Sequence, residues 1–502
     1  MQPNIIFITT DQQRTDSLGC YGAPFAKTPA LDAMAHRGVR FERAYCTNPV
    51  CTPSRASILT GKYMGRHGAW NVGVDVPPEE LFLSHRLKSL GYRTHLIGKA
   101  HFNAWAGDND VSVECIDNWR KRFPAFRGPY YGFDEVEIAL GHTTFGLAGH
   151  YGSWLDEKLG HPCDDAFPIH KRSSSTFQGE AYDWDIPLEL HSSTWTADRV
   201  CAFLERASSD DKPFFLSVGF EDPHSPHALP VEHARTLDPS SAPLPRYTPG
   251  ELDDKPPFFQ IAHEGKLEQS PYRGTYFMAG QGEGADYRDV PPDDARRGRA
   301  YYWGLVELVD RAMSRIFDLL ARTGLDRTTL VVFTSDHGEL LGDHGLWMKG
   351  PFHYEELIRV PLIVQFPNHA HAGTVVKSLV SLADLAPTAL SLTGIDVPGD
   401  MDGVDLKPLV QGQCESMHEQ VFVETVDDPR TLRLKTVVTE RYKLTYYHGQ
   451  SFGELYDLQD DPGEIVNRWE DPGHAAVRQD LLGRIIDFAE PLEKRAVRYD
   501  YA

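Results

Sequence analysis

The stretch Thr329-Leu-Val-Val-Phe-Thr334, followed directly by Ser335-Asp336-His337-Gly338, decides the fold class of this 502-residue sequence. The run is apolar or β-branched on both faces, which is typical of a strand buried inside a sheet that helices cover on both sides. Comparable runs predict further strands at residues 4–9, 92–97, 213–220 and 360–366.

Helical patterns separate these runs. Leucines at 83, 87 and 90 share one helix face ahead of Gly91, and an apolar stripe over residues 305–320 ends at Gly324. Because helix and strand alternate along the chain, we expect an α/β fold whose large mixed, mainly parallel sheet is sandwiched by helices.

The pattern changes near residue 419. Strands separated by turns are predicted at 421–425, 432–439 and 443–447, and a last helix at 475–488. We therefore expect two domains: a large α/β domain over residues 1–413, and a smaller antiparallel α+β subdomain over residues 414–502. Two stretches, 141–195 and 236–294, fit neither pattern. Loops of such length usually cover a functional site.

Composition bounds the class of partner. Hydrophobic residues make up 41% of the chain and charged residues 24%, which is globular composition. The formal net charge of −22 repels nucleic acid, anionic membranes and long polyanions, so none of these is an expected partner. A small anionic substrate in a local basic pocket stays compatible with this charge.

The N-terminus predicts a cytoplasmic location. It lacks the basic region and cleavage site of a signal peptide, and no stretch reaches the roughly 18 apolar residues of a membrane span. The seven cysteines are scattered and include no C-x-x-C pair, which fits neither a disulfide framework nor a zinc site.

Polar residues follow four of the predicted strands. They are Asp11-Gln12, Gly98-Lys99-Ala100-His101, Glu221-Asp222-Pro223-His224 and Asp336-His337. Taken alone, an Asp after a strand fits a turn or a helix cap, a Lys at the start of a loop is usually solvated, and a His beside a proline is usually structural. Ligands of open α/β sheets, however, bind at the carboxyl ends of the strands, so we expect all four groups to meet at one edge.

Part of this set predicts a divalent metal site formed by Asp11, Gln12, Asp336 and His337. Oxygen donors suit Ca²⁺ or Mg²⁺, and one imidazole favours Mn²⁺, so Ca²⁺ or Mn²⁺ rank ahead of Mg²⁺. Two anionic ligands leave the ion net positive and able to act as a Lewis acid toward an anionic ester.

The segment Cys51-Thr-Pro-Ser-Arg55-Ala-Ser-Ile-Leu-Thr-Gly61 predicts a short helix that begins at Cys51 and stops at Gly61. A buried cysteine that caps this helix is one interpretation. A nucleophilic thiolate is another, because the positive end of a helix lowers the pKa of a thiol.

This segment resembles the signature of type I sulfatases, the formylglycine-dependent family of the alkaline phosphatase superfamily. Further similarity lies in Gly98-Lys99-Ala100-His101, in Ser335-Asp336-His337-Gly338-Glu339 with Gly342-Asp343-His344-Gly345, in Lys349-Gly350, and in Glu454–Leu458 with Asp461–Glu464. The resemblance extends over nearly the whole chain and implies an alkaline phosphatase-like fold.

The resemblance also implies site roles. Cys51 would be oxidised to Cα-formylglycine by a formylglycine-generating enzyme, and an oxygen of residue 51 would join the metal ligands. Asp336 would also help to deprotonate the hydrated aldehyde, and Arg55 and Lys99 would hold that hydrate and the sulfate. His101 would act after the alcohol leaves, and His224 with Lys349 would protonate the alcohol. A gem-diol suits such chemistry because its covalent ester breaks by carbon–oxygen cleavage.

The predicted function is therefore hydrolysis of a small sulfate monoester, aryl or alkyl, by a sulfuric ester hydrolase. Gln12 and His337 depart from the Asp and Asn of many sulfatases and also resemble the phosphonate monoester hydrolase and phosphodiesterase branch, which stays an alternative. The presence of both Lys99 and His101 favours the sulfatase over this alternative. The alternative to an enzyme is a non-catalytic protein that binds a metal or an anion and keeps Cys51 unmodified. Assembly as a homo-oligomer is compatible with the sequence.

Five residues near these motifs have less specific signals. His67 and Asn71 are candidates to line the pocket. Asp343 and His344 are expected to shape a turn, and His227, beside a proline, to have a structural role.

Overall fold

An eight-stranded sheet forms the centre of the computed structural model, which describes residues 2–23, 25–105, 112–141, 147–167, 181–266, 271, 287–428 and 432–492. Its strands lie in the order β10-β2-β9-β8-β1-β6-β3-β4. Strand β9 is antiparallel to both β8 and β2, and the remaining neighbouring pairs are parallel. The strands are β1 (Asn4–Thr10), β2 (Val39–Tyr45), β3 (Arg93–Gly98), β4 (Glu135–Leu140), β6 (Phe214–Gly219), β8 (Thr329–Ser335), β9 (Arg359–Gln365) and β10 (Thr374–Ser381).

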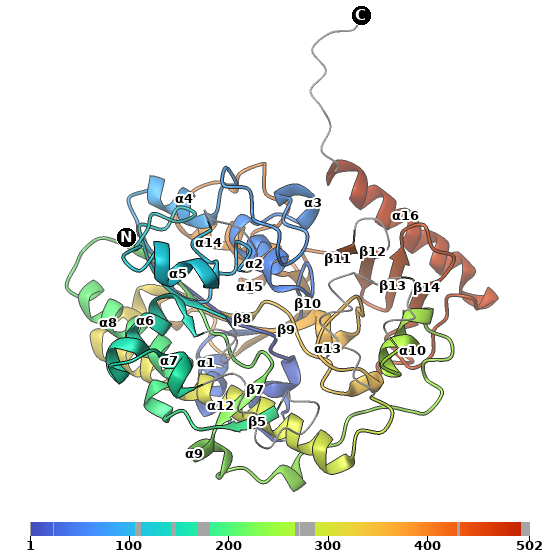
Figure 1. The fold of residues 1–502 in the computed structure, drawn as a ribbon. Helices are drawn as coiled ribbons and strands as arrows, with labels where there is room; N and C mark the ends of the chain where they lie inside the picture. The colour runs from blue at the N-terminus through green and yellow to red at the C-terminus, as the bar shows by residue number, and fades with distance from the viewer. Residues whose placement is uncertain are drawn as a thin grey trace, which may run out of the picture.

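Helices cover both faces of this sheet, as Figure 1 shows. Ile5 and Phe7 of β1 belong to one apolar core and Ile6 and Ile8 to the other, because successive side chains of a strand point to opposite faces. The first core includes α2 (Cys51–Thr60), α4 (Leu83–Ser89), α14 (Leu385–Leu392) and α15 (Lys407–Val410), and the second α1 (Pro29–Arg37), α8 (Ser192–Ala207) and α12 (Pro292–Thr323). The predicted α/β sandwich is confirmed.

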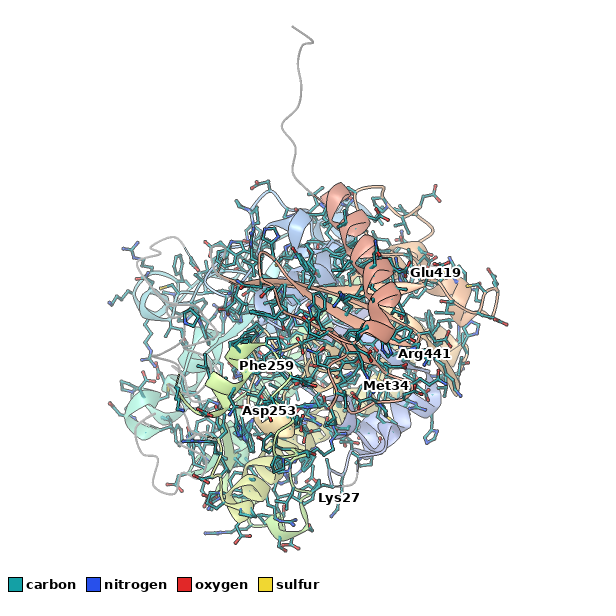
Figure 2. The ribbon with its side chains drawn as sticks, turned by 90° about the vertical axis from the view of Figure 1, so that its right-hand side faces the viewer. Lys27, Met34, Asp253, Phe259, Glu419 and Arg441 are labelled. Carbon is teal, nitrogen blue, oxygen red and sulfur yellow. The ribbon has the colours of Figure 1, made fainter. Side chains whose placement is uncertain are left out.

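A separate antiparallel sheet follows near the C-terminus, in the order β11-β12-β13-β14. Its strands are β11 (Gln420–Asp428), β12 (Leu432–Thr439), β13 (Tyr442–Tyr447) and β14 (Gly453–Asp457). In Figure 2 this part of the chain faces the viewer, and α16 (Ala475–Leu492) lies in front of its strands. The expected antiparallel subdomain is thus present, although the sequence reading missed β14.

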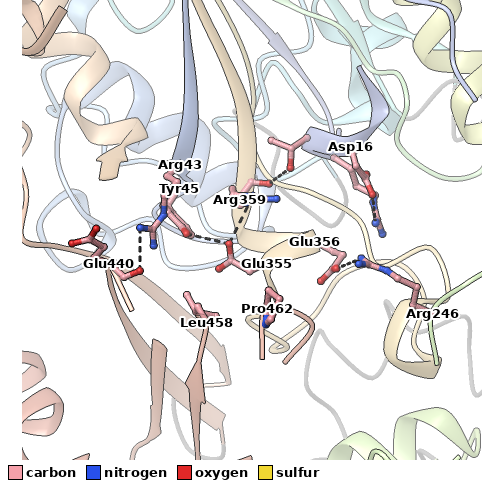
Figure 3. Close-up of a pocket in the computed structure, with 12 residues that line it drawn as sticks. Asp16, Arg43, Tyr45, Arg246, Glu355, Glu356, Arg359, Glu440, Leu458 and Pro462 are labelled. Carbon is pink, nitrogen blue, oxygen red and sulfur yellow. Dashed lines mark hydrogen bonds and ion pairs between the residues drawn. The ribbon is translucent and has the colours of Figure 1, made fainter. Parts of the chain in front are cut away.

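A polar hollow of about 330 Å³ lies where the two sheets meet (Figure 3). Arg43 of β2 donates to the carbonyl oxygens of Thr439 and Glu440, at 2.8 and 3.2 Å. Tyr45 donates to Glu355 of α13 (Glu355–Ile358) at 3.1 Å. Arg43 therefore joins the central sheet to the C-terminal one, and Tyr45 joins β2 to α13.

The two stretches expected to be loops contain regular structure of their own. Within 141–195 lie α6 (Gly149–Leu159), α7 (Cys163–Ala166) and β5 (Ala181–Trp184), which pairs with β7 (His227–Pro230). Within 236–294 lies α10 (Pro257–His263), and α12 begins at Pro292. The expectation of plain loops was wrong because aromatic residues such as Tyr151 and Trp184 build a small core there. Residues 142–146, 168–180, 267–270 and 272–286 of these stretches lie outside the described residues.

Candidate active site

The ends of the parallel strands bring the predicted site residues to one edge of the sheet. Thr10 of β1 pairs with Ser335 of β8, so Asp11 and Asp336 leave the sheet at the same level. Strands β3 and β6 end together at the pair Gly98 and Gly219.

Close backbone contact fixes the end of β3. The N–H of Lys99 donates to the carbonyl of Gly219 at 2.8 Å. A Cβ atom at Gly219 would lie 2.0 Å from the carbonyl oxygen of Lys99, a contact that no side chain can make. Gly98 has a φ of 89°, which glycine adopts without steric cost. These two glycines therefore place Lys99.

Helix α2 supplies Cys51 and Arg55. It begins at Cys51, every one of its residues is buried, and Gly61 ends it with a φ of 68°, as predicted. The hydroxyl of Ser54 donates to the backbone carbonyl of Asp336 at 2.6 Å, which attaches the first turn of the helix to the end of β8.

The candidate metal ligands converge. One ligand atom from each of Asp11, Cys51, Asp336 and His337 lies within 4.8 Å of the others, and all four residues are buried. His337 Nδ1 faces the carbonyl oxygen of Gly338 at 2.9 Å, so the ring proton is on Nδ1 and the lone pair of Nε2 faces the cluster. Burial, followed by the charge of Lys349, lowers the pKa of His337 to about 4, which keeps the ring neutral.

Gln12 completes a donor set that fits a divalent cation. Its side-chain nitrogen donates to Glu339, whereas its Oε1 is buried and has no hydrogen-bond partner among the described residues. A buried carbonyl oxygen without a partner is costly unless it coordinates a cation. Two carboxylates, an amide oxygen and an imidazole are ligands typical of Ca²⁺ or Mn²⁺ sites.

Three cations surround this set. Arg55 Nε lies 2.7 Å from Asp336, its NH2 group lies 3.5 Å from Asp11, and Lys99 forms an ion pair with Asp11. Burial alone would raise the pKa of Asp11, but the charge of Lys99, followed by smaller contributions, holds it well below its usual value. Lys349 lies 3.0 Å from Cys51 Sγ and is the third cation. Such a group of charges suits an anionic ester.

The unmodified thiol is not activated by its place at the helix start. Burial, and next the charge of Asp11, raise the pKa of Cys51 to about 11 although Lys349 and Lys99 oppose this. Of the two interpretations of Cys51, the buried cysteine at the helix start therefore fits the unmodified residue and the low-pKa thiolate does not, because desolvation outweighs the helix dipole.

His224 and Lys349 form a directed pair. His224 Nδ1 hydrogen-bonds the carbonyl of Ser225, so its proton is on Nδ1, and its Nε2 accepts from Lys349 Nζ at 2.9 Å. Burial and the charge of Lys349 hold the pKa of His224 well below its usual value. His224 is thus a neutral acceptor, and the transferable proton is on Lys349.

His101 lies at the same end of β3. Burial, then the charge of Lys99, hold its pKa well below the usual value. Its ring centroid is 5.0 Å from that of Trp105, and Lys99 Nζ is 5.8 Å from the same Trp105 ring. Trp105, which no sequence motif marks, therefore stands beside both groups.

Of the five less specific candidates, His67 supports helix α2 and Asn71 binds the C-terminal sheet. His67 Nε2 contacts Ser57 Oγ of α2 at 3.1 Å. Asn71 donates to the carbonyls of Val426 and Asp427 in β11, at 3.1 and 3.2 Å.

The other three have contacts that support structure. His227 is buried in β7 with a ring centroid 5.4 Å from that of Tyr302. Asp343 pairs with Arg14 at 2.8 Å, and His344 hydrogen-bonds Glu251.

The C-terminal sheet also contacts the loop that carries Lys349. Four residues further on, the ring of His353 hydrogen-bonds Thr436 of β12 at 2.7 Å and Thr425 of β11 at 2.8 Å. Together with the bonds of Asn71, these contacts join β11 to two segments of the candidate site.

Besides Trp105, two supporting residues were missed by the sequence reading. Tyr302 of α12 donates its hydroxyl to the carbonyl of Gln12 at 2.9 Å, and Glu114 accepts the N–H of His101 at 2.6 Å. Neither residue belongs to a motif, and each acts on the backbone of a site segment.

Comparison with known proteins gives the family. A family model described as Sulfatase matches residues 3–395, and one described as N-sulphoglucosamine sulphohydrolase, C-terminal, matches residues 342–490. The chain belongs to the sulfatase family, and it is a sulfuric ester hydrolase with an alkaline phosphatase-like fold.

The similar proteins include sulfatases and a phosphonate monoester hydrolase, the two classes of enzyme considered above. An arylsulfatase of Clostridium perfringens is 29% identical over 93% of this chain and 90% of its own length. The multifunctional alkaline phosphatase superfamily protein PehA of Trinickia caryophylli is 29% identical over 97% and 95%. The crystal structure of the phosphonate monoester hydrolase of Agrobacterium radiobacter matches with a TM-score of 0.79 and 24% identity over 98% of this chain and 96% of that one, which shows a shared fold.

No helix within the described residues combines the length and the apolar character needed to cross a bilayer.

Proposed function

We propose that this enzyme hydrolyses a small aryl or alkyl sulfate monoester to the alcohol and sulfate, with Cys51 converted to Cα-formylglycine. The observation that carries the proposal is the position of Cys51 Sγ, which lies 3.0 Å from Lys349 Nζ, 3.3 Å from His337 Nε2 and 3.5 Å from Asp11 Oδ1. One side chain thus faces a proton donor and two metal-ligand atoms.

A divalent cation would be held by Asp11, Gln12, residue 51, Asp336 and His337, and Ca²⁺ or Mn²⁺ are proposed ahead of Mg²⁺. When present, the cation supplies Lewis-acid stabilisation of negative charge and the hydrated aldehyde supplies the attacking oxygen. Arg55 and Lys99 bind and polarise the anionic ester, since both are buried beside the cluster. Asp336, held by Arg55 at 2.7 Å, is proposed to take the proton of the attacking group.

Lys349 is proposed to give its proton to the departing alcohol. His224, which cannot donate from Nε2 while its proton is on Nδ1, orients Lys349 by accepting its hydrogen bond. His101 is proposed to act after the alcohol has left, by removing a proton from residue 51. Three different side chains thus handle the three protons. Asp336 takes one from the attacking group, Lys349 gives one to the alcohol, and His101 removes one from residue 51.

The natural ester is proposed to be small. The formal net charge of −22 repels long sulfated polymers, while the local cations Arg55, Lys99 and Lys349 attract a monoanion. A cytoplasmic location, maturation by a formylglycine-generating enzyme and assembly as a homo-oligomer are further proposals. So is a division at residue 413 into a catalytic domain, 1–413, and a C-terminal subdomain, 414–502.

Phosphonate monoester or phosphodiester hydrolysis at the same site is the second candidate. It is favoured by His337 in the metal cluster and by Gln12, whose buried Oε1 has no hydrogen-bond partner among the described residues. A sulfate monoester and a phosphate diester each have one negative charge, so the same cations suit both.

The deciding experiment compares kcat/KM for 4-nitrophenyl sulfate, a bis-aryl phosphate and an aryl phosphonate monoester, with the Cys51→Ala variant as control. Mass spectrometry of the peptide that contains residue 51 gives the modified fraction of each preparation. We expect the sulfate to be preferred. Preference for either phosphorus ester would replace the sulfatase assignment by the second candidate, and an intact thiol in fully active enzyme would refute the formylglycine mechanism.

A further inference from the structure

We propose that Glu114 is a positioning residue that holds His101 in the active site by binding three successive backbone N–H groups. Glu114 Oε2 accepts from His101 N at 2.6 Å, and Oε1 accepts from Phe102 N at 2.8 Å and Asn103 N at 3.1 Å. This inference rests on the proposed function, because it assumes that His101 takes part in turnover.

The backbone at His101 needs such support. Its φ of 59° is in the left-handed region, which a residue with a side chain adopts only when its surroundings hold it there. Successive N–H groups that converge on one point form a concave anion-binding site, and a carboxylate fills this one from within the chain. The carboxylate thus compensates for the unfavourable conformation of His101.

Glu114 is itself fixed. Its side chain is buried, and the hydroxyl of Tyr130 donates to Oε1 at 2.6 Å. The next N–H group along the loop, that of Ala104, donates to Asp75 at 2.7 Å. Hydrogen bonds to these two acidic side chains therefore hold every amide from residue 101 to residue 104, and the ring of His101 can keep one position beside Lys99.

The test substitutes Glu114→Gln, which preserves shape but turns an NH₂ group toward the amide donors. A matched control is Asp310→Asn, since Asp310 is another buried carboxylate that accepts two successive amides, Ala30 N at 3.1 Å and Leu31 N at 2.8 Å. Asp310 acts on α1, on the far face of the sheet from helix α2. Both substitutions remove comparable bonds, but only the first changes the His101 loop.

Hydrogen exchange measures the loop without any need for activity. We expect the peptide over residues 99–105 to exchange at least tenfold faster in E114Q and at the wild-type rate in D310N. Unchanged exchange of this peptide in E114Q would overturn the proposal.

Kinetics test whether Glu114 acts through His101. The substrate is whichever ester the wild type hydrolyses. On this ester E114Q should lower kcat about 100-fold with little change in KM, because a small displacement of a reacting group lowers the rate by about this factor. In a His101→Ala background the same substitution should lower kcat less than threefold. Equal losses in both backgrounds would show a structural effect alone and overturn the proposal.

A second variant tests the proposal if E114Q folds poorly. Tyr130→Phe removes one bond to Glu114 and should lower kcat severalfold in the wild type but not in the His101→Ala background; equal losses again overturn the proposal. The proposed function is judged apart from this, by which ester the wild type prefers. If the wild type hydrolyses neither class of ester, the proposed function fails and the exchange experiment alone decides the inference.

Discussion

Replacing Lys349 by methionine should make catalysis depend far more steeply on the leaving alcohol. Lys349 Nζ lies 2.9 Å from His224 Nε2 and 3.0 Å from Cys51 Sγ, and the residue is only 6% exposed. Methionine fills a similar volume but has no proton to give. General acid catalysis contributes about 10²- to 10⁴-fold, or about 3–5 kcal/mol at 1.36 kcal/mol per decade.

The assay is kcat/KM for a series of sulfate esters that range from nitrophenyl to alkyl, on enzyme with a measured fraction of modified Cys51. Alkyl sulfates should lose about 10²- to 10⁴-fold relative to the nitrophenyl ester, since a nitrophenolate leaves without protonation. The loss common to all esters reports the missing positive charge, and the difference between esters reports the missing proton.

His224→Gln is the matched control for this prediction. Glutamine can still accept a hydrogen bond from Lys349, so this variant should lose about tenfold or less on every ester, with no added dependence on the alcohol. If H224Q instead loses as much as K349M on alkyl esters and little on the nitrophenyl ester, His224 is the proton donor and the reasoning from its ring orientation is refuted.

Four further outcomes are expected. Cys51→Ala should lower turnover at least about 10³-fold with an unchanged thermal midpoint, and retained turnover would exclude residue 51 as the nucleophile. Asp336→Asn should lose both bound metal, measured by elemental analysis after dialysis, and activity; a fully metallated, active variant would contradict its place among the ligands. Gly219→Ala should displace Lys99 and lower kcat about 100-fold, since the new Cβ would lie 2.0 Å from the Lys99 carbonyl, and wild-type kinetics would contradict that contact. Burial alone would lower the pKa of His344, but its hydrogen bonds to Glu251 and Glu356 raise this pKa to about 9. The stabilisation that the protonated ring provides, about 3 kcal/mol at most, is therefore complete below pH 6.5 and lost as the pH rises through 9. His344→Asn should lower the urea midpoint strongly at pH 6 and little at pH 10, and a difference that stays constant with pH would refute this.

The parts of the fold that the sequence predicted are those that local chemistry determines. Strand β8 was expected over residues 329–334 and extends over Thr329–Ser335, because a strand buried on both faces is apolar throughout. The helix ends at Gly61 and Gly324 were also correct, with φ values of 68° and 74° that only glycine adopts easily. Neither feature needs knowledge of distant contacts.

Strand β2 shows why other elements were missed. Its sequence, Val39-Arg-Phe-Glu-Arg-Ala-Tyr45, contains three charged residues, which suggest a surface segment. In the structure Arg43 donates to the carbonyls of Thr439 and Glu440, almost 400 residues away along the chain. A partner at such separation leaves no local pattern.

The same limit applies to the site. The residues at strand ends were predicted because the topology of parallel sheets places them together. Glu114 and Tyr302 were not, since they act on backbone atoms of Phe102 and Gln12 rather than on a ligand. The sequence also left two interpretations of Cys51 open, a buried thiol and a low-pKa thiolate, because burial is a property of the whole fold.

The contacts of β11 with Asn71 and, through Thr425, with His353 limit how these enzymes can be recombined. A C-terminal sheet grafted from another sulfatase would have to offer the two carbonyls that Asn71 binds and the two threonine hydroxyls that His353 binds. Without them the loop that presents Lys349 would lose its anchor although every catalytic side chain was kept. The C-terminal sheet and the catalytic loops must therefore be exchanged together. In a chimera, the residues on both sides of these contacts should come from the same parent protein.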